Sequence, residues 1–242
     1  MTDIQDEGGD ASRFRDAGTR EAKLLRLYEM APDPRTGKPT TVPGSVTQSA
    51  AIDSAAAPEH GTSAFEARLR REAHGAREIV IVSDGAAWIE NTADRVFGHG
   101  NVTYILDQFH VPETQRAAVR AMEPDPAEEE RRYERLNSLV KVGTVEPVIQ
   151  ELSRHARRHE EVAKCVGYFR GNIHRMRYGE CQARGMPVGS GVIEGGCKSV
   201  ICGRMKKGGA RWSMKGANSI MALRCRSLNN RMTDLFDWRR AA

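Results

Sequence analysis

The sequence predicts an α/β protein that contains an all-helical insertion. Two short apolar runs, residues 78–83 and 102–106, lie on either side of a stretch with helical periodicity, and an aspartate follows each run. Such an alternation is typical of two parallel strands joined by a helix. Residues 112–186 then have the charged, helix-forming pattern of an insertion, after which a glycine-rich segment leads back to apolar elements.

The residues before this α/β segment are expected to form a lead-in, a hairpin and a helix. Residues 1–19 are polar and lack apolar periodicity, so we expect a flexible lead-in. The segments 20–30 and 41–52 flank "PDPRTGKPT", whose Pro and Gly residues predict the turn of a hairpin. Residues 62–76 place apolar side chains at helical spacing, which predicts an amphipathic helix.

The α/β segment is the clearest part of the chain. "EIVIVSDG" is a continuous apolar run that stops at Asp84, as a buried parallel strand does. "AAWIENTADRVF" has one apolar helical face, and "VTYILDQFH" is a second buried strand that ends at Asp107, with His110 one turn beyond. Functional groups collect at the carboxyl ends of the strands in such sheets, where both aspartates are expected.

Glycines lead the chain out of the insertion and into a helix that carries Glu194, and a final apolar pattern predicts a helix that docks on the core. The predicted organisation is a lead-in, a core made of residues 20–111 and 187–242, and a helical insertion of residues 112–186.

Composition sets limits on location and partners. The chain has 242 residues, of which 29% are charged and 39% hydrophobic, and no run approaches 18 apolar residues. The N-terminus "MTDIQDEGGD" is acidic, so neither a membrane span nor a signal peptide is indicated, and we expect a cytoplasmic protein. The five cysteines are odd in number and form no C-x-x-C motif, so we expect them to be reduced.

Basic residues are concentrated in the last third of the chain. From Lys164 onward there are 16 Lys and Arg residues and 4 Asp and Glu residues, whereas the preceding residues have 21 and 28. A basic face of this kind is typical of a protein that binds a polyanion, of which nucleic acid is the commonest. The alternative is a solvated basic tail, although Trp212 and the apolar periodicity near Ile220 argue against disorder.

Three carboxylates, Asp84, Asp107 and Glu194, each follow or lie on an apolar element beside a glycine or a basic residue. Carboxylates that gather without lysine partners repel one another unless a divalent cation neutralises them, which predicts a site for Mg²⁺ or Mn²⁺. The alternative for Asp84 is a turn or helix cap, and Asp107 could likewise only cap the helix from Val111. His110 could orient a carboxylate, contact DNA or be structural.

The segment "GMPVGSGVIEGGCKSVICGRMKKGGARWS" (residues 185–213) places Glu194 among glycines that permit a close backbone approach. Lys198 is expected on the same helical face, so the alternative is a surface ion pair with Glu194. Basic side chains alternate with glycines in this segment, as on a surface that follows phosphates, and the residues concerned are Lys198, Arg204, Lys206, Lys207 and Arg211. Trp212 is more simply a packing residue than a platform for a base.

Four motifs together resemble a known family. "SDGAAWI", "ILDQFHV", "NIHRMRY" and the glycine-rich segment, in this order, are similar to the C-terminal part of bacterial insertion-sequence transposases of the ISKra type, from about Arg20 to Arg240. The resemblance implies the DDE class, with a ribonuclease-H-like (integrase-type) mixed sheet, a metal-binding Asp-Asp-Glu triad and a helical insertion. It also implies that Asp84 and Glu194 are catalytic metal ligands, with Asp107 and His110 in a supporting D-x-x-H element.

The sequence departs from this family at its N-terminus. In the family the first catalytic Asp ends the first core strand, but none of Asp3, Asp6, Asp10 and Asp16 follows an apolar run. The N-terminal DNA-binding region of the family has no counterpart either. We therefore expect a sheet that is incomplete at its first strand, in a truncated or decayed copy with little strand-transfer activity.

The function expected from the resemblance is DNA transposition, that is, DNA recombination that moves an insertion sequence, which is a mobile element. The chain would act on double-stranded insertion-sequence ends by metal-assisted phosphodiester hydrolysis and strand transfer, as a homo-oligomer on terminal repeats in the bacterial nucleoid. One alternative is a non-catalytic, DNA-binding remnant of a transposase. Another is a metal-dependent nuclease for which Asp84, Asp107 and Glu194 form the complete set of carboxylates.

Overall fold

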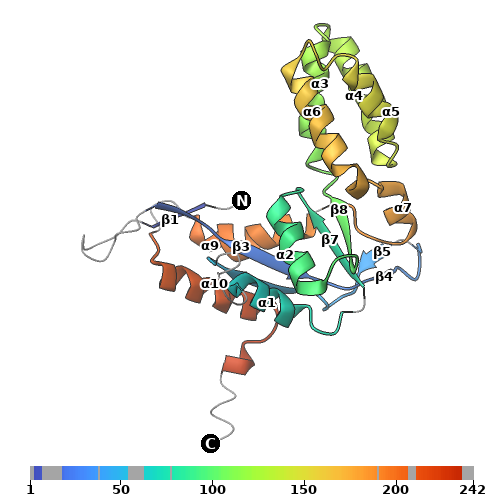
Figure 1. The fold of residues 1–242 in the computed structure, drawn as a ribbon. Coiled ribbons are helices and arrows are strands. Elements are labelled where there is room, and N and C mark those ends of the chain that lie inside the picture. The colour runs from blue at the N-terminus through green and yellow to red at the C-terminus, as the bar shows by residue number, and fades with distance from the viewer. Residues whose placement is uncertain are drawn as a thin grey trace, which may run out of the picture. The chain divides into compact units, whose positions relative to one another are not determined.

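The protein is a mixed α/β chain, as the sequence predicts (Figure 1). In the described part of the chain its strands pair in two-stranded sheets, and the ribonuclease-H-like mixed sheet stays a prediction. A computed structural model describes residues 3–6, 18–37, 39–53, 63–76, 78–189, 191–206 and 211–235. The chain divides into two compact units. The terminal unit comprises Met1–Ala31, Thr41–Arg77 and Gly191–Ala242, and the central unit comprises Pro32–Thr40 and Glu78–Ser190.

The predicted hairpin is confirmed. β3 (Lys23–Leu27) pairs antiparallel with β6 (Thr47–Ala51), and β4 (Met30–Pro32) pairs with β5 (Pro39–Thr41). Between β4 and β5, the side chain of Asp33 accepts hydrogen bonds from two backbone amides of the expected turn.

A short strand lies within the residues for which we expected a flexible lead-in. β1 (Asp3–Asp6) pairs antiparallel with β2 (Gly18–Glu21). The sequence gives little sign of this pair because a ladder of backbone hydrogen bonds needs no apolar periodicity. β1 has the sequence DIQD, with Ile4 as its one apolar residue, so it does not have the apolar character expected of the first core strand.

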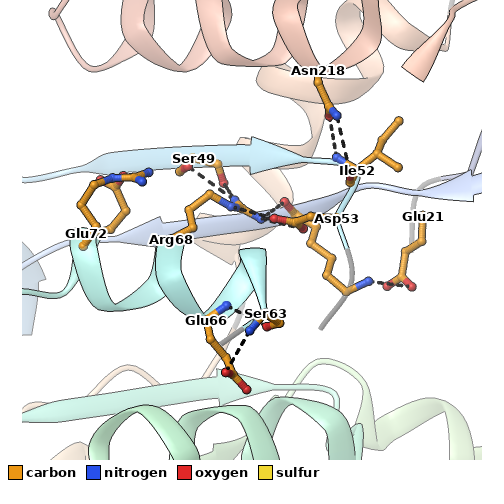
Figure 2. Close-up of polar contacts among 11 residues, drawn as sticks. Glu21, Ser49, Ile52, Asp53, Ser63, Glu66, Arg68, Glu72 and Asn218 are labelled. Atoms are coloured by element: carbon orange, nitrogen blue, oxygen red, sulfur yellow. Dashed lines mark hydrogen bonds and ion pairs between the residues drawn. The ribbon is translucent and has the colours of Figure 1, made fainter. Parts of the chain in front are cut away.

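Helix α1 (Ala64–Glu72) begins with a capping box, in which Ser63 and Glu66 exchange side-chain to backbone hydrogen bonds of 3.1 and 3.3 Å. The buried Arg68 joins this helix to the hairpin (Figure 2). Its guanidinium donates to the carbonyl oxygens of Ser49 (2.6 Å) and Lys23 (3.2 Å), and it holds both carboxylate oxygens of Asp53 at 3.1 to 3.2 Å.

The predicted docking helix is α10 (Met214–Leu228), which packs against β6. The Asn218 side chain accepts a hydrogen bond of 2.7 Å from the Ile52 amide (Figure 2). Asn229, just after the helix, exchanges two bonds with the backbone of Gln48. The apolar core of the terminal unit thus consists of residues from the hairpin, from α10 and from the segment that follows Glu194.

The predicted strand–helix–strand unit is confirmed in the central unit. β7 (Ile79–Ser83) and β8 (Val102–Leu106) are parallel and are joined by α2 (Ala87–Phe97). Helical structure is also observed where the insertion is predicted. Its elements are α3 (Val111–Met122), α4 (Pro126–Lys141), α5 (Glu146–Ser153), α6 (Glu160–Asn172), η1 (Ile173–Arg175) and α7 (Tyr178–Ala183).

The division into compact units differs from the predicted division. Residues 78–111 group with the insertion and with the tip of the hairpin (Pro32–Thr40), whereas the rest of the hairpin belongs to the terminal unit. Ile105 and Leu106 at the end of β8 belong to one apolar core with Val111, with Phe169 and with other residues of the insertion.

None of the five cysteines is paired in a disulfide, and Cys165, Cys181 and Cys225 are buried, whereas their reduced state stays a prediction. Within the described ranges, no helix is both long and apolar enough to cross a bilayer.

Candidate functional site

Asp84 follows the last residue of β7 and is exposed. One of its carboxylate oxygens accepts a hydrogen bond of 3.0 Å from the backbone amide of Ala86. The turn-closing alternative for Asp84 is therefore observed. It uses one oxygen only, and the other makes no hydrogen bond or ion pair with the described residues, so Asp84 can close the turn and still bind a ligand.

Gly85 completes this turn in a conformation that only glycine adopts without strain, with φ of 87°. A Cβ at this position would lie 2.8 Å from Leu106 Cδ1 and 3.1 Å from Asn172 Oδ1. The Asp84–Gly85 turn is therefore packed closely against β8 and against the end of α6.

Asp107 lies at the corresponding position after β8. Ser83 and Leu106 are register partners in the parallel ladder, and the Asp107 amide continues this ladder with a 2.7 Å hydrogen bond to the Ser83 carbonyl oxygen. Asp84 and Asp107 each follow one of these register partners, so they occupy the same carboxyl edge of the sheet. Neighbouring strands lie about 4.8 Å apart, so the two residues are close to each other. This part of the prediction is confirmed.

Asp107 is fully buried. One carboxylate oxygen accepts a hydrogen bond of 3.0 Å from the Phe109 amide, and the other lies 3.4 Å from Nε2 of the half-exposed His110. His110, not Asp107, is the N-cap residue of α3, so the helix-cap alternative for Asp107 is wrong. A buried carboxylate needs such partners, and these two contacts hold the Asp107 side chain in place.

Two tyrosines of the insertion lie within electrostatic range of this edge. Burial raises the pKa of Tyr168 on α6, and the negative charges of Asp84 and Asp107 raise it further. Burial also raises the pKa of Tyr178, and electrostatic interactions with Tyr168 and Asp107 raise it further. Both carboxylates act on the hydroxyl of Tyr168, which agrees with their positions in the ladder.

Glu194 is exposed on α8 (Gly191–Gly196) in the terminal unit. This helix packs closely on β3. A Cβ at Gly196 would lie 2.9 Å from Leu24 Cδ2 and 3.1 Å from Arg26 Cδ. Arg26 also donates a hydrogen bond of 2.7 Å to the carbonyl oxygen of Val192, which lies two residues before Glu194.

The close approach predicted for the glycines is found at some of them. Gly185 has a positive φ of 78°, and a Cβ at Gly189 would overlap the ring of Phe109 at 2.4 Å. Gly191 faces open space, whereas Gly196, which the sequence analysis did not single out, is needed for packing.

A π-helix, η2 (Cys197–Cys202), follows α8 directly. A π-helix shifts backbone hydrogen bonds by one residue and leaves carbonyl groups to be satisfied otherwise. Arg224 of α10 does this, because its Nε donates to the carbonyl oxygens of Ser199 and Val200 at 3.0 Å each. The side chain of Arg224 therefore fixes the segment between Glu194 and the basic residues.

The predicted DNA-binding residues lie in the terminal unit. Lys198, Arg204, Lys206 and Arg211 are exposed, and Lys207 lies outside the described residues. No ion pair joins Lys198 to Glu194 in the described part of the chain, so the surface-ion-pair alternative is not observed. Trp212 packs against the apolar core of the terminal unit, in agreement with a packing role.

The structure therefore brings Asp84, Asp107 and His110 together, whereas Glu194 belongs to the other compact unit. Its approach to Asp84 stays a prediction. Within the described ranges, no group of three or more His, Cys, Asp or Glu side chains is arranged to hold a metal ion. Of the two aspartates, Asp107 is fully buried, whereas the exposed Asp84 keeps one carboxylate oxygen without a partner among the described residues. Carboxylate oxygens are ligands that Mg²⁺ prefers.

Sequence analysis missed two residues that contact the Asp84 turn, Asn172 and Arg175. Both lie in "NIHRMRY", which was noted only for its resemblance. Arg175 donates to the Gly85 carbonyl oxygen at 3.4 Å and pairs with Glu90 of α2.

The fold and the site define an α/β protein with two aspartates at the carboxyl edge of a parallel strand pair, and with a basic helical segment in a second unit. A family profile, described as "Uncharacterised protein family (UPF0236)", matches residues 56–240. The chain belongs to this family. No curated protein and no solved structure matches it.

Proposed function

We propose that the chain is the catalytic domain of a DDE-type transposase of the ISKra type, acting on the DNA ends of its insertion sequence. The observation that carries this proposal is the pair of aspartates, Asp84 and Asp107, at one edge of two parallel strands. The order of the elements supports a ribonuclease-H-like core, because an antiparallel hairpin and a helix precede the parallel strands and a helical insertion follows them.

In this proposal, Asp84 and Glu194 are the catalytic carboxylates and hold Mg²⁺ or Mn²⁺. The bound ion would supply charge neutralisation at the scissile phosphate and a more acidic water. Asp84 fits this role because its second oxygen is exposed and uncommitted, and the turn fixes the first. Asp107 and His110 have the supporting role, since their mutual contact and the bond to the Phe109 amide hold the edge beside Asp84.

Contact with the DNA backbone is assigned to basic residues in the sequence of the terminal unit. They are Lys198, Arg204, Lys206, Lys207 and Arg211, of which Lys207 is outside the described residues. Lys and Arg side chains that replace condensed counterions make binding strongly dependent on salt.

The test is nicking of a linear duplex that carries the terminal repeats of the element, with the full chain and Mg²⁺ or Mn²⁺. We expect metal-dependent nicking that is lost in Asp84→Asn and in Glu194→Gln. Matched controls are Glu134→Gln in the central unit and Glu29→Gln in the terminal unit, both exposed carboxylates that have no assigned role in the proposed site. Nicking that persists in Asp84→Asn or Glu194→Gln contradicts the proposed site.

The same assay separates the two alternatives. Salt-dependent duplex binding by the wild-type chain, without any metal-dependent cleavage, identifies a non-catalytic DNA-binding protein. If Asp107→Asn abolishes nicking as completely as Asp84→Asn does, Asp107 is a metal ligand and the chain acts as a nuclease with its own set of carboxylates.

A further inference from the structure

One side of the insertion lies against the turn that carries Asp84. Tyr168, Asn172 and Arg175 are spaced four and three residues apart along α6 and η1, so they share a face. Asn172 Oδ1 lies beside Gly85, and a Cβ added at Gly85 would lie 3.1 Å from this oxygen. Arg175 donates to the carbonyl oxygen of Gly85 from 90 positions further along the chain.

Arg175 is held from several directions. Its side chain is buried, with a residue exposure of 8%, and burial lowers the pKa of its guanidinium. It forms an ion pair with Glu90 of α2, and its guanidinium carbon lies 5.9 Å from the ring centre of Tyr104 on β8. Arg175 thus links the Gly85 turn to the helix that follows it and to the neighbouring strand.

Asn172 is fixed by its own helix. Its amide nitrogen donates a hydrogen bond of 2.9 Å to the carbonyl oxygen of Tyr168, one turn earlier. This bond directs the amide oxygen of Asn172 away from the helix backbone, and that oxygen lies beside Gly85. Tyr168 is the residue on which the charges of both aspartates act.

We propose that Asn172 and Arg175 are positioning residues for Asp84, and that this face of the helical insertion lines the site that contains Asp84. They hold Gly85 in its positive-φ conformation, and the turn in turn holds the Asp84 carboxylate. The inference rests on the proposed function for the role of Asp84 as a metal ligand, but not for the contacts themselves.

The reason why positioning matters is geometric. Mg²⁺ demands a near-ideal arrangement of its oxygen ligands, and an Asp on an unsupported exposed turn samples several rotamers. Groups that orient a metal ligand commonly change metal affinity by about 10- to 100-fold when they are removed. An insertion that only enlarged the protein would have no such effect.

The first measurement follows the turn itself. The Ala86 amide donates to the Asp84 carboxylate, so its hydrogen exchange, followed by NMR, reports on the position of that side chain. In the full chain without metal, Asn172→Ala and Arg175→Lys should speed this exchange about tenfold, the factor for losing a hydrogen bond to a charged group. Exchange at Ile81 in the middle of β7 should stay unchanged, since that amide is distant from the turn.

The matched control is Arg177→Lys, which makes the same change two residues further on. Arg177 is exposed and lies 3.7 Å from the Glu180 carboxylate on the same segment, so the Ala86 amide should exchange at the wild-type rate. Wild-type exchange at Ala86 in both Asn172→Ala and Arg175→Lys overturns the inference. If Arg175→Lys fails to fold, Asn172→Ala decides alone, because it leaves the buried ion pair with Glu90 intact.

The second measurement is Mn²⁺ binding by electron paramagnetic resonance. We expect the Kd to rise at least tenfold in Asn172→Ala and Arg175→Lys and to stay at the wild-type value in Arg177→Lys. An unchanged Kd in the first two variants of a chain that does bind Mn²⁺ overturns the inference. A wild-type chain that binds no Mn²⁺ contradicts the proposed function, and the positioning of Asp84 is then decided by the Ala86 exchange rate.

Discussion

Replacing Gly85 by alanine should destabilise the protein in two ways, through an unfavourable backbone conformation and through steric overlap, and the same replacement at Gly100 separates the two effects. Gly85 and Gly100 both lie in the central unit, with φ of 87° and 82°. An added Cβ at Gly85 would meet Leu106 Cδ1 at 2.8 Å and Asn172 Oδ1 at 3.1 Å, whereas at Gly100 it would meet nothing within 4 Å. Gly100→Ala is therefore a control that contains only the backbone effect.

The size of each effect follows from these contacts. A positive φ costs a non-glycine residue about 1–2 kcal/mol, and this applies equally to both variants. Atoms forced into a packed site cost about 1–3 kcal/mol more, which applies to Gly85→Ala alone. The smaller entropy of the unfolded chain with alanine, about 0.4–1 kcal/mol, is common to both and cancels in the comparison. We expect the free energy of unfolding to fall about 1–3 kcal/mol further in Gly85→Ala than in Gly100→Ala.

The assay is urea unfolding of the two variants and the wild type, monitored by circular dichroism and fluorescence, with the slope of the free energy against urea compared among the three. Equal destabilisation by the two substitutions would refute the packing of the Asp84–Gly85 turn against β8 and α6. The same result would weaken the case for Asn172 as a positioning residue.

Four further predictions concern other parts of the chain. Arg68→Met should lower the free energy of unfolding by about 3–5 kcal/mol in a urea titration, because it leaves the Asp53 carboxylate buried without its countercharge, whereas a change of the exposed Arg226 to Met should alter it little. Burial raises the pKa of Cys165 to about 12 from 9.0, so at pH 8 its thiol should react with a labelling reagent only in denaturant, as mass spectrometry can show. Above pH 9 the unfolded chain loses this proton first, so the contribution of Cys165 to stability should fall as the pH rises, and Cys165→Ala should remove that part of the alkaline dependence. Arg204→Ala should weaken duplex binding and reduce the slope of log K against log salt by about 0.9, measured by fluorescence anisotropy, and an unchanged slope would exclude a phosphate contact there.

The strand–helix–strand unit was predictable because uninterrupted apolar runs, as in β7 and β8, are typical of parallel strands. The burial expected for the first of them is only partial, since every residue of β7 is half-buried. The same pattern fixed where each strand ends, and so it placed Asp84 and Asp107 at one edge of the sheet. The hairpin and α10 followed from turn residues and helical periodicity, which are likewise local signals.

The contacts that the sequence did not predict are those between distant segments. Arg68 has the ordinary helical surroundings of an exposed arginine, and only the fold brings it to Asp53 and the hairpin backbone. Arg175 similarly meets Gly85 across 90 positions. In the π-helix after Glu194, the carbonyl oxygens of Ser199 and Val200 accept hydrogen bonds from Arg224 of another helix, and helical periodicity does not reveal such contacts.

The terminal unit is assembled from segments at both ends of the chain, and this affects how it folds during synthesis. The Gln48 backbone binds the Asn229 side chain across 181 positions. At about 5–20 residues per second, the hairpin leaves the ribosome roughly 10–35 s before the helix that covers it. The central unit, by contrast, is largely one continuous stretch and can fold in that interval. A nascent chain of this protein should therefore present the bare hairpin to chaperones until its last helix emerges.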